Sequence, residues 1–156
     1  MFVSNRRHLM ASFIFPIALL SACGGSGTEV VVATPRSLTM EKIGTYDGAV
    51  LGAAEITAFD SASKRLFVVN GANRSVDVLD LSAPSAPKLI GTIDISSLGG
   101  GVNSVAVHDG LVALAIEGSV KTALGSVAFF NAADLKLLHS VTVGALPDML
   151  VFTPDG

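Results

Sequence analysis

Three residues with oxygen-bearing side chains recur at nearly constant spacing: Glu55, Asn103 and Asp148, separated by 48 and 45 residues. Each opens a short run rich in Val, Ile, Leu or Phe, which is typical of a strand. If these strands surround one axis, the three side chains meet at one end of it. Carboxylate and amide oxygens are the ligands that Ca²⁺ takes. The three residues are therefore candidates for a ligand or calcium site, and the alternative is that they cap turns or bond to neighbouring strands.

The other residues that could carry chemistry form no recognised constellation. His108 and His139 fall in different predicted strands without a second His or Glu at metal-binding spacing, so we expect them at the surface. Asp60, Asp109 and Asp155 recur at predicted turns, where an Asp side chain bonds to the backbone two residues on. The sequence contains no G-x-S-x-G nucleophile elbow, no P-loop, no H-E-x-x-H zinc-binding motif and no dinucleotide-binding fingerprint. The catalytic residues, if there are any, stay unknown.

Eight short apolar runs, separated by Gly, Asp, Asn and Pro, would position these residues. The first four predicted strands are Glu55–Asp60, Arg65–Asn70, Ser75–Leu81 and Lys88–Ile95. The second four are Asn103–Asp109, Leu111–Glu117, Ser126–Asn131 and Leu137–Val143. A third set begins at Asp148 and reaches only its first turn.

Four strands in a period of about 45 to 50 residues are typical of a β-propeller blade, a WD-like repeat. We therefore predict an all-β fold with two complete blades, about residues 55–95 and 103–143, plus fragments. Lys42–Tyr46 matches part of the strand 88–93 and would be a strand that closes the ring. Because a propeller needs at least four blades, we expect these residues to be the N-terminal part of a longer protein.

The first 22 residues have the composition of an export signal. Arg6 and Arg7 precede Leu9–Leu20, an uncharged run that is too short to span a bilayer. Whether the general secretory or the twin-arginine route exports the chain is left open. Residues 23–39 then begin with a Gly/Ser stretch, which predicts a flexible tether before a partial propeller over 40–156.

The end of this signal, Leu20-Ser21-Ala22-Cys23, resembles the lipobox of bacterial lipoproteins. The resemblance implies cleavage before Cys23 and a diacylglyceryl group on its thiol, and multiple acyl chains would anchor the protein stably. Gly24 replaces the Asp that retains such proteins in the inner membrane, so the resemblance favours the outer membrane. The alternative is an ordinary secretory signal with an incidental Cys.

The composition excludes several classes of protein. The chain has a net charge of −3, which argues against a nucleic-acid partner because that partner requires a basic face. A hydrophobic content of 50% argues against intrinsic disorder. A single Cys excludes an internal disulfide framework and a Cys-based zinc cluster.

The repeats resemble those of choice-of-anchor I proteins over about residues 42–156. The matching motifs are Asn70-Gly71-Ala72, Val76–Ser82, Gly101–Val107, Asp109-Gly110-Leu111 and Leu146–Met149. The resemblance implies a propeller of the seven-bladed type in the intact protein, and a binding or scaffold role in the bacterial cell envelope. Its partner, a protein or a small molecule, is unknown. Some relatives carry an alkaline-phosphatase-like label, so a metal-dependent phosphoesterase with further site residues in other blades is the alternative.

Overall fold

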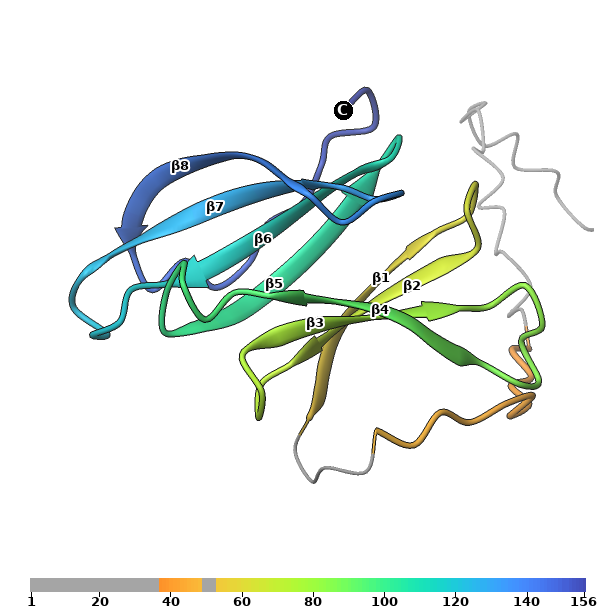
Figure 1. Ribbon diagram of the computed structural model, residues 1–156. Coiled ribbons are helices and arrows are strands. Elements are labelled where there is room, and N and C mark those ends of the chain that lie inside the picture. Colours follow the sequence, from red (N-terminus) through yellow and green to blue (C-terminus); the bar gives the residue numbers. More distant parts are fainter. Residues whose placement is uncertain (1–36, 49–52) are drawn as a thin grey trace, which may run out of the picture. The chain divides into compact units, whose positions relative to one another are not determined.

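Eight strands form two four-stranded antiparallel sheets within residues 37–48 and 53–156, which the computed structural model describes (Figure 1). The first sheet contains, in order, β1 (Ala54–Asp60), β2 (Arg65–Asn70), β3 (Ser75–Asp80) and β4 (Lys88–Asp94). The second contains β5 (Gly101–His108), β6 (Leu111–Glu117), β7 (Leu124–Asn131) and β8 (Leu137–Ala145). These ranges contain no helix. The all-β prediction and the two propeller-type blades are therefore confirmed.

Short turns join the strands of each sheet, as the turn residues predict. The tightest joins β5 to β6 through Asp109 and Gly110 alone, directly after the pair His108–Leu111. Both turn residues have positive φ, 43° and 78°, which is the backbone that a two-residue hairpin of right-handed twist requires. Asp and Gly adopt this conformation more readily than other residues, so the sequence determines the turn.

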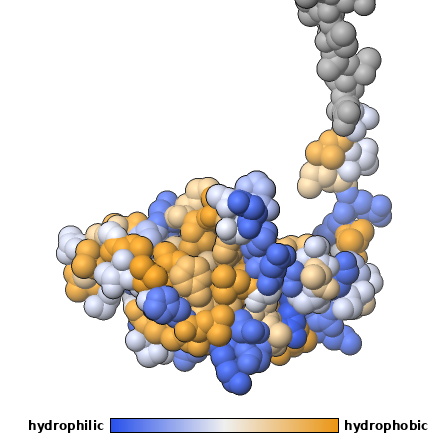
Figure 2. All heavy atoms as spheres, turned by 90° about the horizontal axis from the view of Figure 1, so that it is seen from above, coloured by the Kyte–Doolittle hydropathy of each residue, from blue (hydrophilic) through white to orange (hydrophobic). Residues whose placement is uncertain are grey.

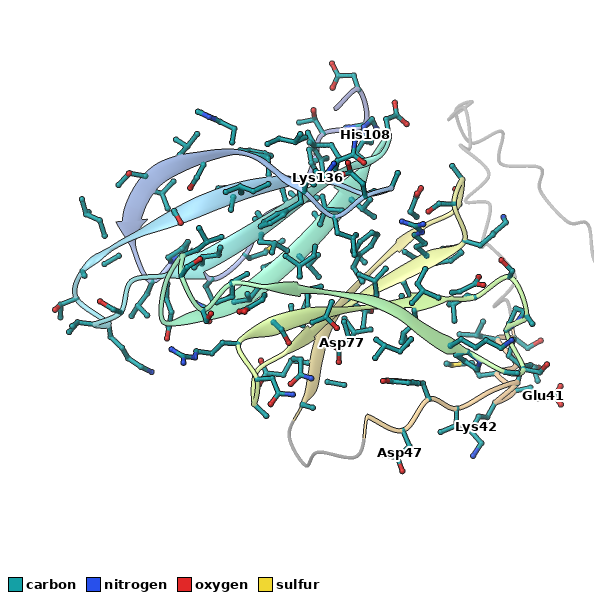
Figure 3. The ribbon with its side chains drawn as sticks, in the orientation of Figure 1. Glu41, Lys42, Asp47, Asp77, His108 and Lys136 are labelled. Carbon is teal, nitrogen blue, oxygen red and sulfur yellow. The ribbon has the colours of Figure 1, made fainter. Side chains whose placement is uncertain are left out.

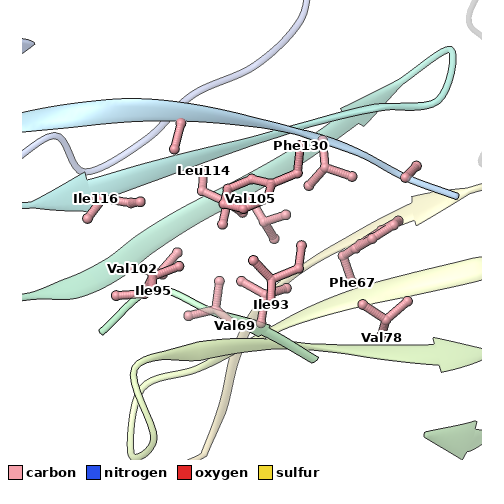
Figure 4. Close-up of a cluster of buried hydrophobic side chains, with 14 residues drawn as sticks. Phe67, Val69, Val78, Ile93, Ile95, Val102, Val105, Leu114, Ile116 and Phe130 are labelled. Carbon is pink, nitrogen blue, oxygen red and sulfur yellow. The ribbon is translucent and has the colours of Figure 1, made fainter. Parts of the chain in front are cut away.

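The two sheets share one hydrophobic core. Alternate residues of β2 and β3 face the second sheet, and alternate residues of β6 and β7 face the first. Figure 4 shows these side chains between the sheets. The core consists of Phe67, Val69, Val76, Val78, Ile93, Ile95, Val102, Val105, Val112, Leu114, Ile116, Ala128, Phe130 and Ala132. The repeat therefore produces a stack of sheets, since each sheet covers one face of its neighbour.

Polar and steric contacts add to this core at the edge of the interface. The strand β5 packs against β1 and β2, so the first strands of the two sheets are neighbours. The Arg65 guanidinium donates hydrogen bonds to the carbonyls of Ala132 and Ala133, the latter at 2.8 Å. A Cβ at Gly91 would lie 2.7 Å from Cδ1 of Leu135, so that leucine side chain packs closely on Gly91 and would have to shift for an alanine. These contacts fix how the second sheet sits on the first.

The fourth strand of the second sheet is its most exposed strand, as expected for the outer strand of a blade, whereas in the first sheet β1 and β4 are both largely exposed. Eight of the nine residues of β8 are exposed and Val143 is half-buried, and large apolar side chains remain exposed at Leu137, Leu138 and Val141. Figure 2, seen from above, shows hydrophobic side chains gathered over the side of the second sheet.

Two predicted strands are not found as strands. Lys42–Tyr46, predicted to close the ring, is irregular chain and lines a cavity over the first sheet with Leu66, Val68 and Leu79. The segment from Asp148 to Gly156 is also irregular, although it runs along the second sheet. A strand requires a hydrogen-bonded neighbour, and no described strand pairs with either segment.

Candidate functional site

Glu55 and Asn103 occupy equivalent positions in the two sheets, as predicted from their spacing. The pairing of β1 with β2 is irregular between Ala54 and Thr57, and that of β5 with β6 is irregular between Val102 and Ser104. Glu55 and Asn103 each fall within this irregularity, which has the character of a β-bulge. A bulge turns a side chain away from the regular alternation and is frequent beside binding sites.

Asn103 contacts the segment that follows the second sheet. Its half-buried side chain donates a hydrogen bond from Nδ2 to the carbonyl of Pro147 at 3.0 Å, and the hydroxyl of Ser104 accepts one from the Leu150 amide at 3.4 Å. Asn103 therefore lies next to the segment that carries Asp148. These contacts are those expected from the alternative interpretation, in which the residue bonds to the neighbouring repeat.

Glu55 and Asp148 are both exposed. A Cβ at Gly71 would lie 2.8 Å from Oε1 of Glu55, so this carboxylate rests against the turn between β2 and β3. Within residues 37–48 and 53–156, no three His, Cys, Asp or Glu side chains are grouped as metal ligands. The calcium site at Glu55, Asn103 and Asp148 stays a prediction, and an ion there would need further ligands.

The remaining predicted residues take simpler positions. His108 packs against Phe152, with ring centroids 5.7 Å apart, and its Nδ1 lies 3.8 Å from the Asp109 carboxylate (Figure 3). His139 is exposed on β8. Cys23 lies outside the described residues. In the part of the chain that the structure describes, no helix has the length and apolar character to cross a membrane.

The two sheets and the segment after them coincide with a known domain. A family model of the choice-of-anchor I domain matches residues 55–156, about two thirds of the chain. The chain belongs to the choice-of-anchor I family. Membership confirms the resemblance seen in the repeats and indicates a cell-surface or exported bacterial protein. A search of curated proteins found no match to this choice-of-anchor I chain.

Sequence reasoning missed a polar group on the first sheet of this choice-of-anchor I domain. Asn70 is 4% exposed and donates a hydrogen bond from Nδ2 to Oδ2 of Asp77 at 2.9 Å. The hydroxyl of Thr92 donates to the other oxygen of Asp77 at 3.3 Å. The second sheet has apolar residues, Ile116 and Ala128, in place of Asn70 and Asp77, and the strand registers are needed to identify them.

The ionised Asp60 side chain is expected to stabilise the domain at neutral pH, and this stabilisation is expected to be lost in acid. Hydrogen bonds from the Ser63 hydroxyl, at 2.5 Å, and from the amides of Ala62 and Ser63 lower the pKa of Asp60 below 3.8. The contribution of Asp60 to the free energy of unfolding is therefore complete above the pKa that Asp60 has in the unfolded chain. It is lost as the pH falls through the lower pKa that Asp60 has in the folded protein. We expect Asp60→Ala to reduce the free energy of unfolding by about 1 kcal/mol at pH 7 and by less near pH 2.

Urea unfolding of both proteins at several pH values measures this difference. Ser63→Ala, which removes the hydroxyl donor but keeps the carboxylate, is expected to reproduce part of the loss at pH 7. A difference between the parent and Asp60→Ala that does not change with pH would contradict the assignment.

Proposed function

We propose that this choice-of-anchor I protein is an exported binding or scaffold protein that Cys23 anchors to the bacterial outer membrane by its lipid. One observation carries the proposal: the single Cys of the chain ends a complete lipobox, and the family domain follows from residue 55. The order is signal, acylated Cys, Gly/Ser tether and propeller blades. That order suits a domain held at a membrane surface with freedom to meet a partner.

The packing of the blades supports binding over catalysis. The half-buried Asn103 amide already donates a hydrogen bond to the carbonyl of Pro147, so it has a structural partner and is not free to act on a substrate. Glu55, which is exposed at the bulge of β1, offers a contact point for a partner. No contact in the described residues favours the phosphoesterase alternative, so it enters only as an outcome of the test below.

Replacing Cys23 by serine is expected to abolish membrane attachment. The full chain would be expressed in a Gram-negative host, and its intact mass and distribution between membrane and soluble fractions would be measured. The parent should be cleaved before Cys23, carry the mass of a diacylglyceryl group with or without an amide-linked acyl chain, and sediment with outer membranes. Ser21→Ala, which keeps the lipobox pattern, is the matched control and should behave as the parent does.

Two results would contradict the proposal. An unmodified product cleaved elsewhere and released to the soluble fraction would mean that Cys23 is incidental. Hydrolysis of p-nitrophenyl phosphate by the parent, abolished by a metal chelator and by replacement of Glu55, Asn103 or Asp148, would favour the phosphoesterase instead.

A further inference from the structure

The outer strands of the two sheets begin with the same kinds of residue, a lysine followed by two large aliphatic side chains. These residues are Lys88, Leu89 and Ile90 at the start of β4, and Lys136, Leu137 and Leu138 at the start of β8, each 48 residues further along. All six are exposed. They are called the rim patch below, because the outer strand of a blade lies at the perimeter of a propeller.

Both outer strands carry a bulge at the same residue of this motif. In β4, Ile90 falls in the register shift and has no partner on β3. In β8, Leu138 falls in the corresponding shift and has no partner on β7. An extra residue bends the strand and turns a side chain away from the regular alternation. The exposed aliphatic residue at each bulge is therefore a feature of the repeat.

The two halves of the rim patch lie beside each other. A Cβ at Gly91, the residue after Ile90, would lie 2.7 Å from Cδ1 of Leu135, the residue before Lys136. This contact joins the start of β4 to the start of β8 across the interface of the sheets. The patch is therefore one continuous surface, to which each sheet contributes three residues.

The neighbouring sheet does not cover the rim patch. Leu137 pairs with Phe130, which faces the first sheet in the shared core, yet Leu137 is 47% exposed with that sheet in place. Ile90 is 48% exposed with the second sheet in place. The equivalent residues of the other sheet, Leu89 and Leu138, are 48% and 57% exposed. Because these fractions differ so little, the exposure follows from the position at the perimeter.

The charged groups of this surface have both signs. The Lys136 ammonium lies 3.2 Å from the Asp134 carboxylate, and Asp80 is opposite Lys88 in the ladder between β3 and β4. An exposed ion pair contributes little to stability, so either lysine can exchange its partner for a phosphate. Ammonium and carboxylate groups side by side complement the phosphate and the amine of a zwitterionic phospholipid. The long lysine side chains allow the charge to stay in water while the neighbouring aliphatic groups are buried.

The anchor proposed at Cys23 brings a bilayer close to the rim patch. A flexible chain as long as residues 23–39 spans about 20 to 25 Å on average. The chain enters the domain at this corner, because residues 41–44 line a cavity together with Pro84 and Pro87, in the loop directly before Lys88 (Figure 3). A surface held at so short a distance is met at a high effective concentration. The bilayer is therefore the partner that the chain itself brings to the patch.

We propose that the rim patch docks on a bilayer of zwitterionic phospholipid, with its four aliphatic side chains at the boundary of the acyl chains and its two lysines at the phosphates. The proposal rests on the lipid anchor proposed above and gives the anchored domain an orientation. The outer strands lie against the membrane, which leaves the ends of the inner strands open to a partner. Docking adds to the attachment by the acyl chains and does not replace it.

The chain contains no Trp, so an introduced Trp reports only its own surroundings. Leu138→Trp would be made in the full chain, acylated at Cys23 and reconstituted in vesicles of phosphatidylcholine and phosphatidylethanolamine. We expect its emission to shift to the blue and to lose at least half of its intensity when the phosphatidylcholine carries bromine on its acyl chains. Val120→Trp, which replaces an exposed aliphatic residue in the loop at the opposite end of the second sheet, is the matched control and should stay in water.

A second measurement uses the parent chain, because Trp itself favours membrane interfaces. Phospholipids with a photoactivatable group in the acyl chain would be cross-linked to the acylated parent, and mass spectrometry would locate the adducts. We expect adducts on residues 88–90 and 136–138. The double variant Leu89→Ser with Ile90→Ser should reduce them severalfold, with an unchanged circular dichroism spectrum.

The outcomes separate docking from anchoring. An acylated chain in which bromine does not quench the Leu138→Trp variant, or in which the adducts lie elsewhere, overturns the docking and leaves the anchor standing. A blue shift without quenching would mean that a second copy covers the patch, which also overturns the docking. An unacylated product contradicts the anchor. Coupling Cys23 of the chain from residue 23 onward to a maleimide lipid then tests the docking by the same two measurements.

Discussion

Phe67→Ala is expected to lower the stability of the domain strongly and to move its unfolding to lower urea concentrations. The Phe67 side chain is fully buried in the core between the sheets, where it lies among residues of both sheets. Truncating a buried Phe to Ala removes transfer free energy and leaves a cavity, at a cost of about 3 to 5 kcal/mol. Since small domains have a total stability of only about 5 to 15 kcal/mol, this loss removes a large part of it. The midpoint of urea unfolding, followed by circular dichroism, measures the effect.

Phe59→Ala is the matched control. Phe59 lies on β1 and is 48% exposed, so the same truncation should cost less than about 1 kcal/mol. Equal losses in the two variants would mean that the sheets do not pack together through Phe67, and the shared core would then be wrong.

Gly125→Ala is expected to destabilise the second sheet by about 1 to 3 kcal/mol. Gly125 is buried in β7, and a Cβ there would lie 2.6 Å from the carbonyl oxygen of Ile116 and 2.5 Å from Cδ of Pro147. The first of these atoms is backbone of the neighbouring strand, so it cannot move without disturbing the ladder. We expect the segment after β8 to shift away as well. Urea unfolding gives the stability, and hydrogen exchange of the Leu150 amide reports the segment.

Gly144→Ala provides the comparison within the same pair of strands. A Cβ at Gly144 would meet no atom within 4 Å, and this glycine is not among those with positive φ. Alanine should therefore leave the stability unchanged or raise it slightly, because it restricts the unfolded chain. A loss at Gly144 as large as that at Gly125 would show that the close approach of Gly125 to Ile116 and Pro147 is not the cause.

The strands were predictable because local sequence determines them. β2 and β6 are short apolar runs between turn residues, and Asp109-Gly110 specifies the hairpin between β5 and β6 by its backbone preference. The predicted strand Lys42–Tyr46 was wrong for a related reason. The residues 42–46 match residues 88–93 in their pattern of side chains, but a segment forms a strand only where a neighbouring strand pairs with it.

The candidate sites were only partly predictable. The spacing of Glu55 and Asn103 indicated their equivalence, and the register confirms it. Their bulges could not be foreseen, because a bulge depends on how two strands pair and not on one run of residues. The pair Asn70–Asp77 appears unremarkable in the sequence, since Asn and Asp are common near turns. Only the pairing of the strands shows that Ile116 and Ala128 are its counterparts.

The Arg65 contact limits how far the blades are interchangeable. Arg65 pairs with Asp80 at the start of the β2–β3 ladder, and Leu111 holds the corresponding position opposite Asn131 in the second sheet. Leucine cannot donate the hydrogen bonds that the guanidinium makes to Ala132 and Ala133. A designer who lengthened the array by copying residues 103–143 would therefore obtain an interface between sheets that lacks these two hydrogen bonds. The residues at each interface between neighbouring blades would have to be chosen separately.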